Sequence, residues 1–263
     1  MTPPVGLVAG AGALPRELAR RLRAGGRRVV CVQLDGDPAQ LEELCDRHES
    51  VPVARALDAL KVFEEERVRE LVMAGKVDKL QALRGAAGVR ELAGRRDGRD
   101  PELWRAVRRL LEDRGFSVLA PAALVPDLVA QKGPVAGRAP TQRERDDLAL
   151  GFRVARLVAA AGVGQAVAVR DGVVLAAEAA EGTDAMVRRC SAFGPGAVVV
   201  KVAWPQGDPG FDPPVVGPET LAAMREAGAT ALGVEAGATL LLDLPALRAA
   251  ARQLDLAVVG LTP

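Results

Sequence analysis

The chain has 263 residues, 49% hydrophobic and 26% charged, a composition typical of a globular protein whose length favours two domains over one. Its 35 basic and 34 acidic residues leave a formal charge of +1, which gives no electrostatic reason to expect nucleic acid or an anionic membrane surface as the main partner. A lone histidine and three widely spaced cysteines argue against histidine-based catalysis, zinc sites and a disulfide framework.

Chemistry is therefore expected from carboxylates, lysine, arginine, backbone amides and a bound metal. His48 lies in a polar stretch, so we expect it to be a solvated surface residue. The first fifteen residues lack the basic region of a signal peptide, and no uncharged run elsewhere reaches the length of a membrane span. We expect a cytoplasmic protein.

Apolar runs and amphipathic patterns alternate along the N-terminal half. Strands are predicted at 5–9, 28–34, 51–53, 70–74 and 116–119, and helices at 15–23, 59–69 and 101–114. Strands that alternate with helices predict a mainly parallel, doubly wound sheet. The fold class is therefore α/β, with a first domain over residues 1–132.

A stretch rich in glycine and proline, 133–140, is the predicted linker to a second α/β domain over residues 141–263. Thr141 and Glu144 have the spacing of a capping box, which predicts a helix from 141 to about 161. Strands then follow at 165–169, 173–178, 197–202, 231–234, 239–242 and 257–261, with helices at 219–227 and 245–254.

The first motif, Gly10-Ala-Gly-Ala-Leu-Pro15, follows the first strand and opens a helix. Glycines there allow close backbone approach, and the helix amides can bind a phosphate. Asp35 stands where a dinucleotide-binding fold places its ribose-binding acid, but Pro15 replaces the third glycine of that fingerprint. A phosphate site, a nicotinamide site and a purely structural turn remain open, with the nicotinamide site least favoured.

The second motif, Glu178-Ala-Ala-Glu181-Gly-Thr-Asp184-Ala-Met186, places three acids at a strand end, with Thr183 as the expected N-cap of a helix. Three carboxylates at a turn suit Mg²⁺, which prefers oxygen ligands. Equally, Asp184 can favour the helix N-terminus while both glutamates are solvated.

The third motif places Lys201 inside an apolar strand, where an unpaired ammonium group is costly, so a ligand phosphate or a nearby acid is expected as its partner. The following loop carries Asp208 and Asp212 among prolines and glycines that constrain its shape. Such loops often bear function, although a rigid surface turn with solvated aspartates is the alternative.

These segments together resemble the I-type UDP-2,3-diacylglucosamine pyrophosphatases of lipid A biosynthesis. The resemblance is carried by segments 6–15, 72–77, 163–165, 178–186, 200–201, 212–217 and 234–237, and it spans nearly the whole chain. Its most specific element is the Glu-Gly-Thr-Asp-Ala-Met block at 181–186.

The resemblance implies a Rossmann-like domain and a second α/β domain that hold the substrate between them. It implies Mg²⁺-dependent (or other divalent-cation-dependent) hydrolysis of UDP-2,3-diacylglucosamine to UMP and 2,3-diacylglucosamine 1-phosphate, lipid X. The family's essential aspartate, in its Asp-x-Pro-x-x-Gly segment, matches Asp212. The alternatives are a non-catalytic sugar-nucleotide-binding protein and, less favoured, a nicotinamide-dependent reductase.

The candidate site residues are Asp212 and Lys201 for catalysis, Gly10, Gly12, Ala13, Gly75, Gln165 and Thr183 for substrate binding, and Glu178, Glu181 and Asp184 for the metal. Among these, Asp212 alone is carried over from the family. The expected partner is a lipid-linked UDP-sugar, with no nucleic acid and at most peripheral contact with the inner membrane. A homodimer is left open.

Overall fold

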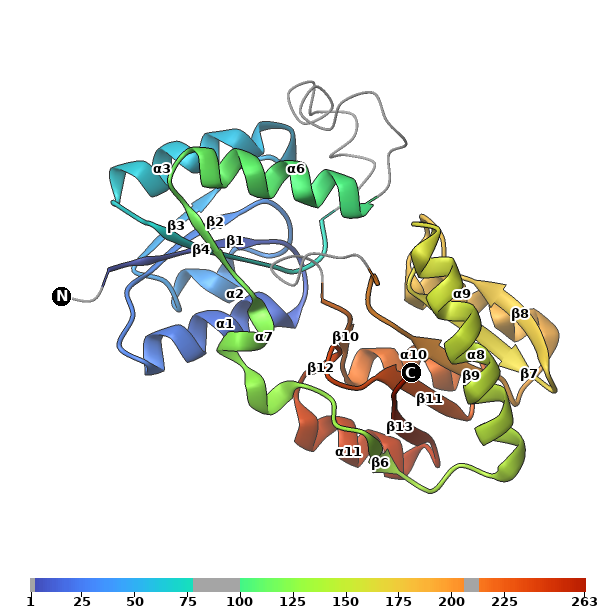
Figure 1. Cartoon of the computed structure of the whole chain (residues 1–263). Coiled ribbons are helices and arrows are strands. Elements are labelled where there is room, and N and C mark those ends of the chain that lie inside the picture. The colour runs from blue at the N-terminus through green and yellow to red at the C-terminus, as the bar shows by residue number, and fades with distance from the viewer. Residues whose placement is uncertain (1–2, 78–99, 206–212) are drawn as a thin grey trace. The chain divides into compact units, whose positions relative to one another are not determined.

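The computed structural model describes residues 3–77, 100–205 and 213–263 (Figure 1). The described residues divide into two compact units, the first ending at Pro126 and the second beginning at Asp127. Both units combine helices with a β-sheet, which confirms the predicted α/β class with two domains.

The N-terminal unit is built on a parallel sheet with the strand order β3-β2-β1-β4-β5. Its strands are β1 (Val5–Ala9), β2 (Val29–Gln33), β3 (Arg47–Ser50), β4 (Glu70–Ala74) and β5 (Ser117–Leu119). Its helices are α1 (Ala13–Ala24), α2 (Ala39–Glu42), η1 (Val53–Asp58), α3 (Ala59–Glu65), α6 (Asp100–Asp113) and α7 (Pro121–Leu124).

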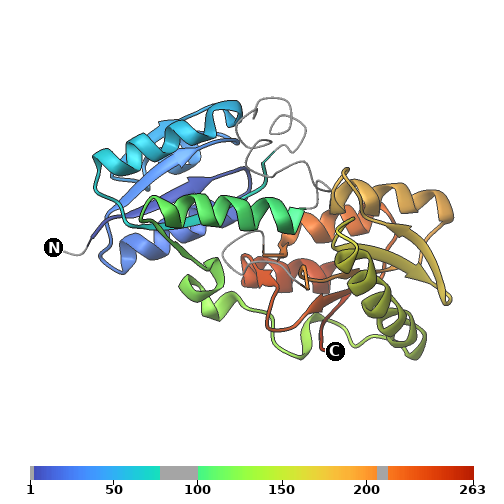
Figure 2. The ribbon, with the colours of Figure 1, turned by 45° about the horizontal axis from the view of Figure 1, so that its top comes forward.

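Helices cover both faces of this sheet, which is why its central strands are apolar runs without alternation. Helix α1 buries Leu14, Leu18 and Leu22, which recur every four residues along one side. Helices α3 and α6 pack on the opposite face, around Phe63 and Leu111 (Figure 2). The predicted doubly wound arrangement is therefore confirmed.

One predicted strand of this unit, 51–53, is wrong. The strand there is β3, which ends at Ser50, and a 3-10 helix, η1, begins at Val53. Pro52, between the two elements, has no N–H to donate to a sheet and fixes its own backbone angle, so it ends the extended segment.

The C-terminal unit has a mixed sheet with the order β6-β13-β11-β9-β7-β8, and a small parallel pair, β10-β12. The strands are β6 (Gly133–Gly137), β7 (Ala166–Arg170), β8 (Val173–Ala177), β9 (Val198–Lys201), β10 (Val215–Val216), β11 (Ala231–Glu235), β12 (Leu240–Leu241) and β13 (Ala257–Leu261). The helices are η2 (Pro126–Leu128, which begins at the unit boundary), α8 (Gln142–Ala160), α9 (Thr183–Arg189), η3 (Cys190–Phe193), α10 (Pro218–Glu226) and α11 (Leu244–Gln253).

Helix α8 covers one face of this sheet with Leu148, Phe152 and Ala155, which pack on valines of β7 and β9. Helices α9, α10 and α11 cover the other face, where Met186 and Leu221 are buried. Strands β9, β11 and β13 are mutually parallel, so their carboxyl ends meet at one edge of the sheet.

The predicted linker, 133–140, is part of the second unit. Residues Gly133–Gly137 form β6, which pairs antiparallel with β13. The same glycines and prolines that suggest a linker allow close approach there: a Cβ on Gly137, whose φ is 72°, would lie 1.8 Å from the carbonyl oxygen of Leu256. The composition of this segment therefore reflects tight packing.

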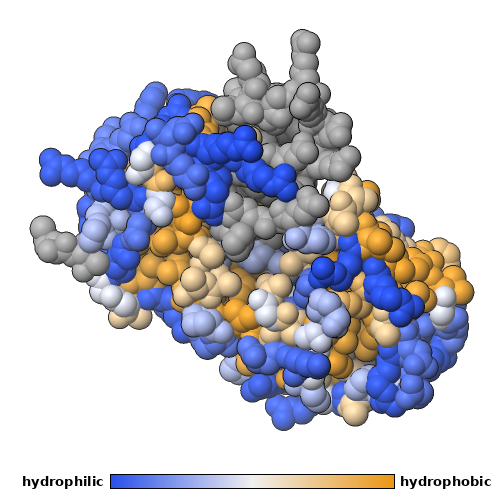
Figure 3. Space-filling model, in the orientation of Figure 1, coloured by the Kyte–Doolittle hydropathy of each residue, from blue (hydrophilic) through white to orange (hydrophobic). Residues whose placement is uncertain are grey.

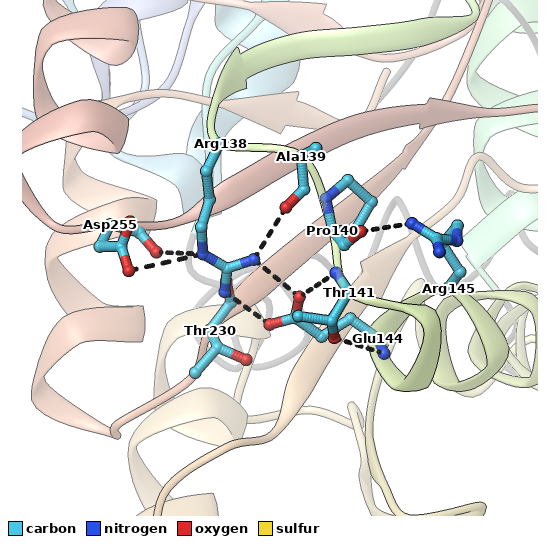
Figure 4. Close-up of polar contacts among 8 residues, drawn as sticks. All are labelled: Arg138, Ala139, Pro140, Thr141, Glu144, Arg145, Thr230 and Asp255. Atoms are coloured by element: carbon cyan, nitrogen blue, oxygen red, sulfur yellow. Dashed lines mark hydrogen bonds and ion pairs between the residues drawn. The ribbon is translucent and has the colours of Figure 1, made fainter.

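Arg138 fixes the end of that segment (Figure 4). Its guanidinium donates to both carboxylate oxygens of Glu144, at 2.6 and 2.7 Å, and to the carbonyl oxygen of Asp255 at 2.9 Å. Glu144 also accepts from the Thr141 amide at 2.8 Å, while Thr141 Oγ1 accepts from the Glu144 amide, so the predicted capping box is confirmed. This network joins the end of β6, the start of α8 and the turn between α11 and β13.

Glu144 should make stability depend on acid pH. Its hydrogen bonds with Arg138 hold the pKa of the buried carboxyl near 2, below the ordinary 4.5. Because the folded pKa is depressed, this stabilisation is complete above the unfolded pKa and is lost as pH falls from about 5 to about 2. Glu144→Gln should lower the free energy of unfolding at neutral pH by about 2 kcal/mol and flatten that acid dependence, as measured by urea unfolding.

The matched control is Asp146→Asn, since Asp146 is exposed on the same helix and accepts a hydrogen bond from the neutral side chain of Gln142. It should keep the acid dependence of the unmodified chain. If Glu144→Gln keeps that dependence as well, the assigned role of Glu144 is contradicted.

Strand β8 is an edge strand of its sheet. Val173 and Val174 on it are exposed, and Figure 3 shows hydrophobic residues gathered over this part of the C-terminal unit. No helix in the described ranges has the length and apolar character needed to cross a membrane.

Candidate functional site

The carboxyl ends of β1 and β4 lie side by side in the N-terminal unit, with Ala9 paired to Ala74. After β1 the chain builds β2 and β3 on one side and then crosses to β4 on the other. In open α/β sheets, ligands bind outside the carboxyl ends of the strands at such a reversal point. The predicted glycine turn lies at this position.

Gly10 and Gly75 bring two backbone segments into direct contact at this point. The Gly10 amide donates to the carbonyl of Ala74 at 2.8 Å, and Ala11 and Lys76 exchange two bonds of 2.7 and 2.8 Å. A Cβ on Gly10 would lie 2.3 Å from the Lys76 oxygen. The amides of Gly10 and Ala11 are thus used within the protein, so the predicted diphosphate contact is not made by the Gly10 amide.

Gly12 and Ala13 are exposed at the start of α1. Gly12 precedes the helix with a φ of 104°, and a Cβ built on it would have no atom within 4 Å among the described residues. The first amides of a helix lack intrahelical partners and favour anions. These two residues therefore stay candidates for phosphate binding.

Asp35 and His48 lie near the neighbouring strand ends. The Asp35 carboxylate accepts from the Gly36 amide at 2.7 Å, and thus closes its own turn. His48 is half-buried in β3, with Nε2 2.9 Å from Gln33 Oε1, so the prediction of a solvated surface residue is wrong. The cause is that β3 begins at Arg47 and brings this polar stretch into the sheet.

Polar residues gather at one edge of the C-terminal sheet. Glu178 follows β8, Gln165 precedes β7, Lys201 ends β9 and Glu235 ends β11. Because β7 runs antiparallel to both β8 and β9, its start lies beside their ends. Gln165 accepts from the Val202 amide at 2.8 Å, which joins two of these positions directly.

Glu178 connects two of the predicted substrate contacts. Its carboxylate accepts from the Gln165 amide and from the Thr183 hydroxyl, each at 3.0 Å. Thr183 is the first residue of α9 and Gly182 is the N-cap, so the predicted cap was one residue late. The structure thus brings Gln165, Glu178 and Thr183 together.

Glu181 and Asp184 complete the predicted metal-binding trio, but they do not converge with Glu178. Glu181 pairs with Arg189 at 2.8 Å, and its own backbone amide together with this guanidinium lowers the pKa of its carboxyl. Asp184 lies in the first turn of α9. Within the described ranges, no group of three or more His, Cys, Asp or Glu side chains is placed to hold a metal ion.

Lys201 is half-buried at the end of β9, and its Nζ donates to the carbonyl oxygen of Val215 at 3.2 Å. This bond joins the end of β9 to the start of β10, the two strands on either side of residues 206–212. One partner of the ammonium is thus a backbone oxygen. The phosphate or acid expected from the sequence stays a prediction.

Glu235 and Arg156 form a partly buried ion pair that the sequence prediction missed. Glu235 accepts from Arg156 at 2.6 Å and from the Ala203 amide at 2.8 Å. The signal was present, because Glu235 is an acid at the end of an apolar strand and lies in segment 234–237. Its partner on α8 is 79 positions away and has no sequence signature.

Comparison with known proteins decides the family. The family model described as the LpxI N-terminal domain matches residues 4–128, and that of the LpxI C-terminal domain matches residues 131–259. A curated relative, the UDP-2,3-diacylglucosamine pyrophosphatase LpxI of Caulobacter vibrioides, is 31% identical over 98% of each chain. The chain belongs to the LpxI family.

Six of the seven segments that suggested LpxI meet at the two edges described above. Segments 6–15 and 72–77 join where Ala11 pairs with Lys76. Segments 163–165, 178–186, 200–201 and 234–237 meet at the carboxyl edge of the second sheet. Asp212, the residue matched to the LpxI aspartate, lies outside the described residues.

Proposed function

We propose that this chain hydrolyses the pyrophosphate bond of UDP-2,3-diacylglucosamine and releases UMP and lipid X, a step of lipid A biosynthesis. The observation that carries the proposal is similarity over the whole length. Both LpxI domain models match, and the Caulobacter vibrioides pyrophosphatase aligns over 98% of each chain. Cleavage of this bond is the reaction that the relative's name describes.

In this proposal Asp212 is the catalytic carboxylate, which orients or deprotonates the attacking water. The exposed start of α1 at Gly12 and Ala13 contributes backbone donors to the diphosphate. Lys201 adds positive charge at the end of β9. Gln165 and Thr183, which Glu178 holds together, contact the substrate from the second sheet.

We also propose that a divalent cation, Mg²⁺ or a similar ion, is required. Glu178, Glu181 and Asp184 do not fit as its ligand set, because Glu178 bonds Thr183 and Gln165 while Glu181 bonds Arg189. Mg²⁺ is commonly held by one or two carboxylates together with substrate phosphates, so the diphosphate itself can supply ligands. The cation would offset the charge of the diphosphate.

The substrate in this proposal is lipid-linked, so the enzyme meets it at the cytoplasmic surface of the inner membrane by peripheral contact. A homodimer stays a prediction.

The test incubates the purified chain with UDP-2,3-diacylglucosamine in Mg²⁺ or in excess chelator, with UDP-N-acetylglucosamine as a comparison substrate. The expected result is UMP release from the diacylated substrate in Mg²⁺ and loss of release in chelator. Tight binding of UDP-sugars without any UMP would support a non-catalytic binding protein instead. Saturable NAD(P)H binding that depends on Asp35 would support a reductase.

A further inference from the structure

Arg156 lies at the carboxyl edge of the C-terminal sheet, although it belongs to a helix. It is in the last part of α8, and its Nη1 reaches Glu235, the final residue of β11. Glu235 in turn accepts from the Ala203 amide, two residues beyond the end of β9. The guanidinium is therefore beside the strand ends where the LpxI segments meet.

The position of Arg156 is fixed by its neighbours. Its guanidinium carbon lies 5.9 Å from the centre of the Phe152 ring, a cation–π distance, and Nη1 is 2.6 Å from the Glu235 carboxylate. Glu235 is 9% exposed and is itself fixed by a backbone amide. A guanidinium whose orientation is set before binding loses less side-chain freedom when a ligand arrives.

Arg156 keeps donors available. A guanidinium carries five N–H groups, and the hydrogen bond from Arg156 to Glu235 uses one nitrogen, Nη1. Its side chain is 36% exposed. Planar N–H pairs of this kind match the oxygens of phosphate.

Gln165 gives an independent sign that this edge receives a ligand. It is 8% exposed, and its side-chain Nε2 is buried without a hydrogen-bond partner among the residues that the structure describes. Its backbone is bonded to Val202 and to Glu178, so the residue is held beside the segment that follows β9 and carries Ala203. Buried donors are rarely left unpaired, since this costs stability.

We propose that Arg156, oriented by Glu235, is a phosphate-binding residue for the diphosphate of the substrate, and that the Gln165 carboxamide donates to an acceptor on the same ligand. The ligand class is a nucleoside diphosphate or its sugar ester. The proposal rests on the proposed function for the presence of a diphosphate, but it concerns binding and is testable without turnover.

The test measures binding of UDP and of uridine to the full-length chain by calorimetry. Arg156→Met should weaken UDP binding about 10- to 100-fold, reduce its dependence on salt and leave uridine binding unchanged. Arg156→Lys should recover part of the loss. Arg153→Met is the matched control, since Arg153 is exposed one turn earlier on α8, and it should bind UDP as the unmodified chain does.

Unchanged UDP affinity in Arg156→Met would overturn the assignment. An equal loss for uridine would overturn it too, because it would indicate a structural defect, and so would failure of the unmodified chain to bind UDP. If the unmodified chain binds UDP through Arg156 but releases no UMP, only the proposed hydrolysis fails.

Gln165→Met tests the second donor. Methionine is close in size and needs no hydrogen bond, so the variant should unfold at the same temperature as the unmodified chain or higher, while binding the UDP-sugar about 10-fold more weakly. A lower unfolding temperature would show that the amide already has a partner in the free protein, and would remove Gln165 from the proposal. Unchanged UDP-sugar affinity would do the same.

Discussion

Asp212→Asn should reduce UMP release from UDP-2,3-diacylglucosamine by about 10²- to 10⁴-fold, the range expected when a general acid or base is removed. Asparagine keeps the size of the side chain but cannot accept a proton from water. The residue is singled out because the Asp212-x-Pro-x-x-Gly217 segment resembles the LpxI segment that carries the essential aspartate. The measurement is an initial rate at saturating substrate, and the loss should appear in kcat more than in KM.

Asp208→Asn is the matched control, because Asp208 lies in the same segment between Pro205 and Pro213 but outside the resemblance. It should retain most of the activity. UDP-sugar binding by Asp212→Asn should also persist, which separates lost catalysis from a lost fold. If Asp212→Asn retains full activity, Asp212 is not the catalytic carboxylate.

Gly10→Ala should destabilise the N-terminal unit by about 3 kcal/mol, a large effect for one methyl group. The new Cβ would lie 2.3 Å from the carbonyl oxygen of Lys76, a backbone atom that cannot rotate away. Relief requires separating the segments that Ala11 and Lys76 join by two hydrogen bonds. Urea unfolding should show the lower stability, and substrate binding should weaken with it.

Gly25→Ala provides the comparison. Gly25 ends α1 with a φ of −78°, and a Cβ there would meet backbone oxygens at 3.4 and 3.5 Å, which is ordinary contact. The free energy of unfolding of Gly25→Ala should stay within about 0.5 kcal/mol of that of the unmodified chain. Equal stability of both alanine variants would contradict the close approach at Gly10.

The regular parts of this fold follow from local pattern. The capping box at Thr141 and Glu144, the amphipathic stripe of α1 and the apolar runs of β1 and β2 each specify their own element, so they can be predicted without tertiary information. The error at β6 has the opposite cause. The glycines and proline there allow β6 to pair closely with β13, more than 110 positions away in sequence. Composition alone does not reveal this partner, and it therefore predicts a linker.

The site is harder to predict because its contacts are distant in sequence. Motifs indicated which segments matter, and those segments do meet at two sheet edges. They did not indicate the hydrogen-bond partner of each side chain. Glu178 accepts from Gln165 and Thr183, and Lys201 donates to a backbone oxygen. The pair of Arg156 and Glu235 joins a helix to a strand, and no spacing rule connects them.

Hydrolysis of UDP-2,3-diacylglucosamine in ¹⁸O-labelled water, with both products analysed by mass spectrometry, tests whether the protein cleaves the pyrophosphate bond with water. We expect UMP and lipid X in equal amounts, with one ¹⁸O atom incorporated per bond cleaved and carried by one of the two products. Intact substrate after prolonged incubation in Mg²⁺, or products without the label, would contradict the assignment of this LpxI family member as a pyrophosphate hydrolase.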